Sequence, residues 1–371
     1  MRILMAHWRL GRSGAQIVMS QLSEHFRSSG HRVDFVTTVD YGLAAQEFHS
    51  SCDELWHCHD TGTEPPLRYL ERFRSRILKR GYDVLVTHHS LQAVAVAGLL
   101  PTSIATVSVI HEHPVLGAGY VGLSNPDAFD AYVGVSNGVT EGIRSMLREG
   151  SRILCIVNGV PAGNCPDRLP RDEFHALYVG RLNEEQKGIL LLPQIVRAAR
   201  NRGIPLHLTL VGEGKDKPKL VEAIQESGAG RWISVLGSLP QNEVFDHMAA
   251  ADVFLLCSHH EGLALVVLEA MVRGCVPIAT DLRDSTAEAI TPGVDGFLIG
   301  DRSPDSFADS IELLWRDSGR LTKMRAEAHR TASTRFSAQR MVGEYEALFN
   351  ELLTLPAGRR RIQNCERFMS A

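Results

Sequence analysis

Short apolar runs alternate along the whole chain with longer stretches in which apolar residues recur at helical spacing. Continuously apolar strands are typical of a parallel sheet that helices cover on both faces. In the first half, the pattern predicts strands at Arg2–Ala6, Arg32–Val36, Asp83–Thr87, Ile104–Ile110, Ala131–Val135 and Ile153–Ile156, and helices near residues 15–29, 65–80, 91–100 and 137–149.

Residues 157–173 interrupt this alternation, because they contain three prolines and no sustained period, which indicates a linker. The alternation then starts again. It predicts strands at His175–Val179, His207–Val211, Ile233–Leu236, Val253–Leu256, Val276–Ala279 and Phe297–Ile299, and helices that include residues 188–202 and 241–250. We therefore predict an α/β chain with two Rossmann-like, doubly wound domains. The expected boundaries are 1–160 and 161–335 for the domains, 336–355 for a C-terminal amphipathic helix and 356–371 for a basic tail.

The composition narrows the class of protein without identifying a partner. A chain of 371 residues is long enough for two domains, and 44% hydrophobic and 22% charged residues are ordinary for a globular protein. The net charge of -4, from 39 basic and 43 acidic residues, gives no overall field that would attract nucleic acid. Seven cysteines without a C-x-x-C pair argue against a disulfide framework or a zinc site. No stretch has the length and apolarity of a membrane span or signal peptide, so we expect a cytoplasmic protein.

The most informative segment runs from Glu261 to Gly274, between two predicted strands. Gly262 allows a sharp turn, and the free N–H groups at the start of the next helix would attract an anion such as a diphosphate. Glu269 lies eight residues after Glu261, about two helical turns further along the same side. Carboxylates accept hydrogen bonds from vicinal hydroxyls, so the segment suggests a nucleotide-sugar site. A solvated glutamate on an ordinary amphipathic helix is the alternative.

Two cations follow another strand of the same predicted sheet. Strand His175–Val179 leads directly into Arg181 and Lys187 at its carboxyl end. A guanidinium and an ammonium there would stabilise the charge that develops on a departing diphosphate. The sequence has no D-x-D motif for a divalent cation, so we expect neither a metal nor a cofactor. Ordinary surface charges at a helix start are the alternative, although the helix dipole disfavours cations there.

These segments resemble the retaining family-four glycosyltransferases of GT-B fold over nearly the whole chain. In the second half the resemblance rests on Val-Gly180-Arg181-Leu with Lys187-Gly188, on Leu-Val-Gly212-Glu-Gly214, and on Glu261 to Glu269 followed by Ala-Met and Gly274. In the first half it rests on Ser13-Gly14-Ala15-Gln16, His111, Val-Ser136 and Asn158-Gly159, and near the end on Phe336-Ser with the last helix, which resembles the segment that crosses back to the first domain. The resemblance implies two Rossmann-like domains facing a cleft, and a metal-independent transferase whose donor is a nucleotide diphosphate sugar.

The resemblance also implies roles for individual residues of the second domain, the donor side. Arg181 and Lys187 would hold the diphosphate of the nucleotide sugar. Glu269 would bind the ribose. The nucleobase, the sugar and the acceptor are left open.

The donor sugar itself would be engaged by Glu261 and by the backbone amides of Gly262 and Leu263. From the first domain, the acceptor side, Gly14 would approach the phosphates. His111 would contribute a hydrogen bond or its backbone carbonyl at the reactive face of the sugar. The family retains the anomeric configuration by a front-face attack in which the leaving phosphate helps to deprotonate the acceptor, so Glu261 need not be a nucleophile.

The first half departs from the family pattern at two places. Ser13 and Gln16 stand in a loop where the family usually has a glycine and a glutamate, which weakens the phosphate contact expected there. Glu112 and His113 follow His111 where the family often has an aspartate, so the acceptor stays undetermined.

Two other functions compete with a transferase. Gly134-Val-Ser136-Asn-Gly138 matches the nucleophile elbow of serine hydrolases, but Ser136 suits a helix N-cap equally well and no H-G-G-G loop precedes it. A catalytically silent relative could bind a nucleotide sugar and support a partner enzyme. An NAD enzyme is disfavoured, because Lys217 replaces the third glycine after Gly212 and Gly214.

Two further features concern ligands and partners. Histidines come in pairs, but without a third ligand at metal-like spacing they indicate polar pocket or surface residues. These pairs are His57-x-His59, His88-His89, His111-x-His113 and His259-His260. The basic amphipathic stretch at residues 67–80 could contact an anionic membrane that carries a lipid-linked acceptor, although such helices more often pack on their sheet.

Overall fold

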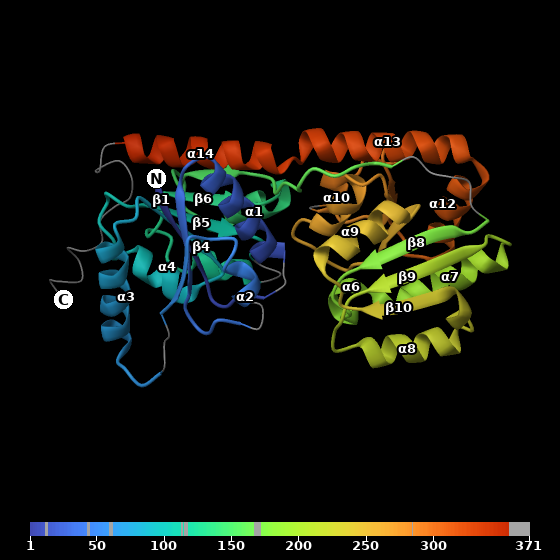
Figure 1. Ribbon diagram of the computed structural model, residues 1–371, viewed down its shortest axis with the longest axis horizontal. Coiled ribbons are helices and arrows are strands. Elements are labelled where there is room, and N and C mark those ends of the chain that lie inside the picture. Colours follow the sequence, from blue (N-terminus) through green and yellow to red (C-terminus); the bar gives the residue numbers. More distant parts are fainter. Residues whose placement is uncertain are drawn as a thin grey trace. The chain divides into compact units, whose positions relative to one another are not determined.

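Parallel strands form two separate sheets in the computed structural model, one of seven strands and one of six. The structure describes residues 1–11, 14–42, 45–58, 62–112, 114, 118–166, 172–283 and 285–355. It divides into two units, Met1–Gly159 with Ala338–Ala371, and Val160–Ser337 (Figure 1). The predicted α/β fold class with two doubly wound domains is confirmed.

The first unit contains the strand order β3-β2-β1-β4-β5-β6-β7. Its strands are β1 (Arg2–His7), β2 (Arg32–Thr37), β3 (Glu54–His57), β4 (Val84–His88), β5 (Ala105–Ile110), β6 (Ala131–Gly134) and β7 (Ile153–Cys155). Its helices are α1 (Gly14–Ser28), α2 (Ala45–Phe48), α3 (Pro66–Arg80), α4 (Leu91–Ala97), η1 (Ala118–Leu123), α5 (Asn137–Met146) and α14 (Ala338–Thr354). Every residue of β4, β5 and β6 is buried, as expected for strands that are covered on both faces.

The second unit contains the strand order β10-β9-β8-β11-β12-β13. Its strands are β8 (Phe174–Val179), β9 (Leu206–Val211), β10 (Ile233–Gly237), β11 (Val253–Leu256), β12 (Val276–Thr280) and β13 (Phe297–Ile299). Its helices are α6 (Glu184–Lys187), η2 (Ile189–Leu191), α7 (Leu192–Asn201), α8 (Lys217–Glu226), η3 (Gly230–Trp232), α9 (Gln241–Ala250), α10 (Leu265–Met271), α11 (Thr286–Ala289), α12 (Pro304–Arg316) and α13 (Ser318–Arg335).

The chain reverses its winding direction at one place in each sheet. In the first sheet this place lies between β1 and β4, and in the second between β8 and β11. Doubly wound sheets bind ligands outside the carboxyl ends of the strands at this switch point, because the loops on its two sides diverge there. A ligand site is therefore expected among the residues that follow β1, β4, β8 and β11.

The sequence pattern missed strand β3, which pairs with β2 at the edge of the first sheet. Only Trp56 among its four residues is buried, so no continuous apolar run marks the strand. The predicted helix at 188–202 begins instead as the 3-10 turn η2 and continues as α7 from Leu192. The expected basic tail at 356–371 lies outside the described residues.

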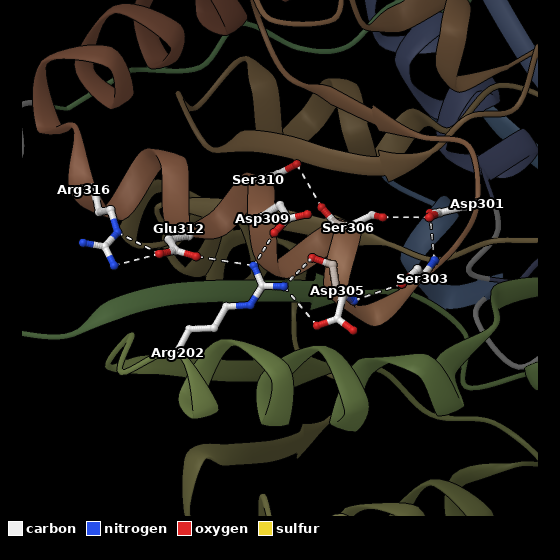
Figure 2. A network of polar contacts seen from close by, with 9 residues as sticks. All are labelled: Arg202, Asp301, Ser303, Asp305, Ser306, Asp309, Ser310, Glu312 and Arg316. Atoms are coloured by element: carbon white, nitrogen blue, oxygen red, sulfur yellow. Dashed lines mark hydrogen bonds and ion pairs between the residues drawn. The ribbon is translucent and has the colours of Figure 1, made fainter.

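Arg202, which caps the C-terminal end of α7, connects this helix to α12 through a network of polar contacts (Figure 2). Its guanidinium donates to Asp305 at 3.0 Å and to Glu312 at 3.4 Å, and also pairs with Asp309. Arg316 donates to Glu312 at 2.8 Å. Most of these side chains are exposed, so the network fixes one helix on the other and contributes only modestly to stability.

Candidate functional site

The loops after β8 and β11 meet through an ion pair at the switch point of the second sheet. Lys187 Nζ lies 2.5 Å from Glu261 Oε1, and the side chains are only 15% and 8% exposed. The hydroxyl of Ser258 donates to the same carboxylate oxygen at 2.5 Å. The structure thus brings together one cation and one carboxylate that the sequence placed after different strands, and it adds Ser258, which the sequence analysis had missed.

Close backbone packing holds the two loops together. Gly188 ends α6 with a φ of 59°, and a Cβ at this position would lie 2.3 Å from the carbonyl oxygen of Cys257. The backbone N–H of His259 donates to the carbonyl of Gln186 at 2.8 Å. The guanidinium of Arg302 donates to the carbonyl of Cys257 at 3.0 Å. The backbone of Arg302 is left-handed, with a φ of 52°. Only glycine fits between these groups at position 188, which explains the Lys-Gly pair.

Arg181 follows β8 at a point where the chain beyond β8 packs closely against the chain beyond β9. A Cβ at Gly212 would lie 1.9 Å from the carbonyl oxygen of Gly180, so the chain needs glycine there. The Tyr178 hydroxyl donates to the carbonyl of Arg181 at 3.1 Å and fixes this turn. Burial raises the pKa of Tyr178, the nearby charge of Glu261 raises it further, and Arg181 opposes the rise. Tyr178 therefore lies within electrostatic reach of both charged groups.

The guanidinium of Arg181 is exposed and makes no hydrogen bond or ion pair within the described part of the chain. It makes no contact with the Lys187–Glu261 pair within the described residues, so the structure brings two of the four predicted charged groups directly together. A free, exposed guanidinium at the carboxyl edge of a sheet remains available for an anion.

Glu269 lies on α10 and is buried. Its side chain makes no hydrogen bond to any described residue, although the nearby Arg273 donates to its backbone carbonyl at 2.9 Å. Burial raises the pKa of Glu269 to about 7, and the charge of Arg273 limits the rise. Buried polar groups are normally hydrogen-bonded, so this carboxyl group lacks a partner that a ligand with hydroxyl groups could supply.

The turn before α10 leaves backbone donors free. Among the described residues, the N–H groups of Gly262 and Leu263 donate no hydrogen bond, and Ala264 caps the helix without a side-chain bond. Gly262 does not adopt a left-handed φ, so the sharp turn expected from it is made by ordinary backbone conformations. Gly274, by contrast, has a φ of 68° just beyond the end of α10, a position that favours glycine.

The predicted residues of the first unit lie at the carboxyl edge of its sheet. Gly14 is exposed and begins α1, while Ser13 lies outside the described residues. Gln16 is buried and donates to the carbonyl of Arg9 at 3.0 Å, so it acts within the loop itself. His111 follows β5, and its Nε2 lies 2.8 Å from Nδ1 of His88.

The other histidine pairs have separate surroundings. His57 Nδ1 lies 2.5 Å from the hydroxyl of Thr37, and His259 contacts the guanidinium of Arg302. His59 and His113 lie outside the described residues. Within the described ranges there is no group of three or more His, Cys, Asp or Glu side chains arranged to hold a metal ion.

Ser136 serves as the N-cap of α5. Its side-chain oxygen accepts a hydrogen bond from the Val139 amide at 3.2 Å, and the residue is fully buried. A Cβ at Gly134 would lie 2.3 Å from the Thr140 hydroxyl, so packing accounts for the first glycine of the motif. The capping interpretation therefore explains the segment without a nucleophile.

The described cysteines, six in number, are free, and four of them are buried. No helix in the described ranges is both long enough and apolar enough to cross a bilayer.

Comparison with known proteins identifies both halves of the chain. Residues 12–163 match the family described as "Glycosyltransferase Family 4", and residues 166–332 match "Glycosyl transferases group 1". Exopolysaccharide phosphotransferase SCO2592 of Streptomyces coelicolor is 29% identical over 282 residues, which cover 73% of this chain and 29% of the relative. The GtfA subunit of a UDP-N-acetylglucosamine–peptide N-acetylglucosaminyltransferase of Streptococcus agalactiae is 27% identical over 263 residues, covering 67% and 50%. The chain thus spans half or less of the length of these curated relatives.

Solved structures show the same fold over nearly the whole chain. The pneumococcal O-GlcNAc transferase GtfA in complex with UDP and GlcNAc has a TM-score of 0.79 at 14% identity, covering 96% of this chain and 99% of its own. Anabaena Alr3699/HepE in complex with UDP and glucose has a TM-score of 0.78 at 17% identity, covering 95% and 100%.

Proposed function

The chain belongs to the GT-B glycosyltransferases of the family-4 type, and on this basis we propose that it transfers a hexose-type sugar from a nucleoside diphosphate to an acceptor, with retention of the anomeric configuration. We propose that this happens in the cytoplasm and without a metal ion. The GtfA and HepE structures named above contain UDP, which supports UDP as the first nucleotide to test.

The observation that carries the donor assignment is the buried carboxyl group of Glu269, which lacks a hydrogen-bond partner in the described part of the chain. A ribose offers two adjacent hydroxyl donors, which match a carboxylate with two oxygens. The free amides of Gly262 and Leu263 and the free guanidinium of Arg181 supply donors for the sugar and the diphosphate. These groups all follow β8 or β11, the strands on either side of the switch point.

We propose that Glu261 and Lys187 act as a pair. The carboxylate of Glu261 accepts hydrogen bonds from hydroxyls of the donor sugar, and the ion pair holds the carboxylate and the ammonium group of Lys187 in place. Lys187 and Arg181 then stabilise the negative charge that grows on the leaving diphosphate. Glu261 needs no nucleophilic role in this scheme, because the leaving phosphate accepts the proton of the acceptor hydroxyl. The family resemblance implies either a hydrogen bond or the backbone carbonyl of His111 at the reactive face of the sugar, and we propose that the side chain donates the hydrogen bond.

We propose further that the acceptor is a carbohydrate that stacks on aromatic side chains of the first unit. Trp8 and Tyr41, which follow β1 and β2, are 40% and 46% exposed. Backbone bonds from Val39 to Trp8 at 2.9 Å and from Leu10 to Tyr41 at 3.2 Å hold their loops together. An exposed aromatic face packs well against the C–H face of a sugar ring.

Contact with an anionic membrane is a separate proposal that depends on α3, the helix of the basic stretch. Four of its arginines are engaged within the first unit: Arg72 pairs with Glu64, Arg74 donates to Leu99, Arg76 donates to His57 and Arg80 pairs with Glu54. This engagement favours the packing role of the helix over membrane contact. Flotation of the protein with anionic vesicles tests the point, and robust binding would restore the membrane as a partner.

A turnover assay with a panel of nucleotide sugars tests the proposed function. We expect release of one nucleoside diphosphate, with UDP-sugars as the first candidates, and an acceptor glycoside of unchanged anomeric configuration. A catalytically silent binding protein would instead show thermal stabilisation by a nucleotide sugar without release of the nucleoside diphosphate.

A further inference from the structure

Four histidines gather at the switch point of the first sheet. His7 ends β1 and His88 ends β4, and these two residues are paired in the sheet register. His89 follows directly, and His111 comes immediately after β5. The ring centroids of His7 and His89 are 6.1 Å apart, and those of His89 and His111 are 5.3 Å apart. Of these four histidines, only His111 has a role implied by the family resemblance.

One hydrogen bond within this cluster joins the side chains of His88 and His111. Nδ1 of His88 lies 2.8 Å from Nε2 of His111. His88 has no exposed surface, whereas His111 keeps 7% of its surface exposed, so the accessible edge of the pair belongs to His111. Burial lowers the pKa of both imidazoles well below the usual value, and the neighbouring histidines lower it further. Both rings are therefore neutral at pH 7, and each carries one N–H.

Burial decides which ring donates. The Nε2 atom of His88 is buried and has no hydrogen-bond partner among the described residues. If His111 donated, the only proton of His88 would lie on this atom, and a buried N–H would be left without an acceptor. If His88 donates through Nδ1, its buried Nε2 is an unprotonated acceptor. A buried donor without a partner is rarer than an unused acceptor, so the second arrangement is favoured.

The consequence for His111 is a fixed tautomer. Its Nε2 accepts the bond from His88, so its single proton lies on Nδ1. Nδ1 of His111 makes no hydrogen bond within the described part of the chain. His111 in this form is a hydrogen-bond donor and has no free lone pair to act as a base.

The backbone supports this arrangement at a cost. His89 has a φ of 50°, a left-handed conformation that is uncommon and unfavourable for a residue with a side chain. The turn at His89 ends β4 immediately after His88 and leads to Ser90, the N-cap of α4. Such a strained conformation persists only where the surrounding contacts impose it. Here the turn at His89 fixes the end of β4, the strand that carries His88.

We propose that His88 is a positioning residue, whose Nδ1–H donates to Nε2 of His111 and holds His111 in the tautomer that presents Nδ1–H to an oxygen atom of the donor sugar. The inference rests on the proposed function for the identity of the oxygen atom, but the tautomer itself depends only on the first unit. Asparagine at position 88 can replace the donor, because its side-chain N–H₂ lies near the position of histidine Nδ1, whereas leucine cannot.

Long-range ¹H–¹⁵N NMR of the histidine rings in the full chain tests the tautomer directly, with the His111 signals identified by their loss in H111N. We expect a protonated Nδ1 and an unprotonated Nε2 for His111 in the wild type and in H88N. In H88L we expect His111 to become a mixture of tautomers. A wild-type spectrum with the proton on Nε2 of His111, or an unchanged His111 spectrum in H88L, would overturn the proposal.

Kinetics supply the second readout. We expect H88L to lose about tenfold in kcat with little change in the donor KM, and H88N to stay within about threefold of the wild type. Equal losses in the two variants would contradict a positioning role even if both fold. If H88L does not fold, the wild-type spectrum and H88N still decide the question. If the wild type transfers no sugar from any donor, the proposed function fails, while the NMR result still decides the tautomer.

Discussion

Replacing Glu269 by glutamine removes the charge of the buried carboxyl group on α10 and keeps its approximate shape. Burial raises the pKa of Glu269 from 4.5 to about 7. The folded protein therefore binds this proton more tightly than the unfolded chain does. The resulting stability is complete below pH 4.5 and is lost as the pH rises toward 7.

The difference between 4.5 and about 7 corresponds to about 3 kcal/mol of folding free energy that the unliganded wild type loses across this range. E269Q has no such titration. We therefore expect its stability relative to the wild type to rise between pH 5 and pH 8, by up to about 3 kcal/mol. Urea unfolding at several pH values measures this difference. The exposed Glu222 on α8 provides a control, because E222Q should follow the wild-type pH dependence.

Folding favours the protonated form of Glu269, whereas nucleotide binding should favour the ionised form. Hydroxyl groups that donate to Glu269 favour its ionised form, so wild-type affinity for UDP should rise with pH up to about 7. The phosphate of UDP also titrates in this range. The pH dependence of UDP binding to E269Q contains this phosphate titration alone, so E269Q serves as the control. At pH 8 we expect E269Q to bind UDP about ten- to a hundredfold more weakly, as for a lost charge-assisted hydrogen bond. Calorimetry that finds equal affinity at pH 8, or the same pH dependence in both proteins, would refute the assignment of Glu269.

Further variants test the other groups. R181A should fold normally and lose about ten- to a hundredfold in kcat/KM, because the guanidinium is exposed and unpaired in the described structure; wild-type turnover would reject its role. K187A should lose activity and, unlike R181A, about 3 kcal/mol of stability, because the carboxylate of Glu261 is left buried without its ammonium partner. Adding E261Q to K187A should restore stability but not activity. S136A should lose about 1 kcal/mol of stability with its helix cap and keep transfer within about tenfold, whereas abolished turnover would favour a nucleophile. W8A should raise the acceptor KM about tenfold and leave the donor KM unchanged; a change in the donor KM alone would contradict the stacking proposal.

Much of the fold could be predicted from the sequence, because parallel strands that are buried on both faces appear as continuous apolar runs. Strands β11 and β13 begin and end at the predicted residues. The edge strand β3 could not be found in this way, since three of its four residues are only partly buried and the strand has no continuous apolar run.

The candidate site could be predicted as a set of residues but not as a set of contacts. The carboxyl ends of neighbouring parallel strands meet, so the approach of Lys187 to Glu261 follows once β8 and β11 are known to be adjacent. Strand order is a property of the whole sheet and has no local signal. The role of Arg302 depends on a left-handed backbone position without a glycine, which no pattern in the sequence marks.

The rate of nucleoside diphosphate release tests the central claim most directly. Release of nucleoside diphosphate from a nucleotide sugar should be measured for the wild type and for the double variant R181A/E269Q, with circular dichroism to show that both are folded. The account predicts release by the wild type and a loss of at least a hundredfold in the double variant. Release at the wild-type rate by the folded double variant would contradict it.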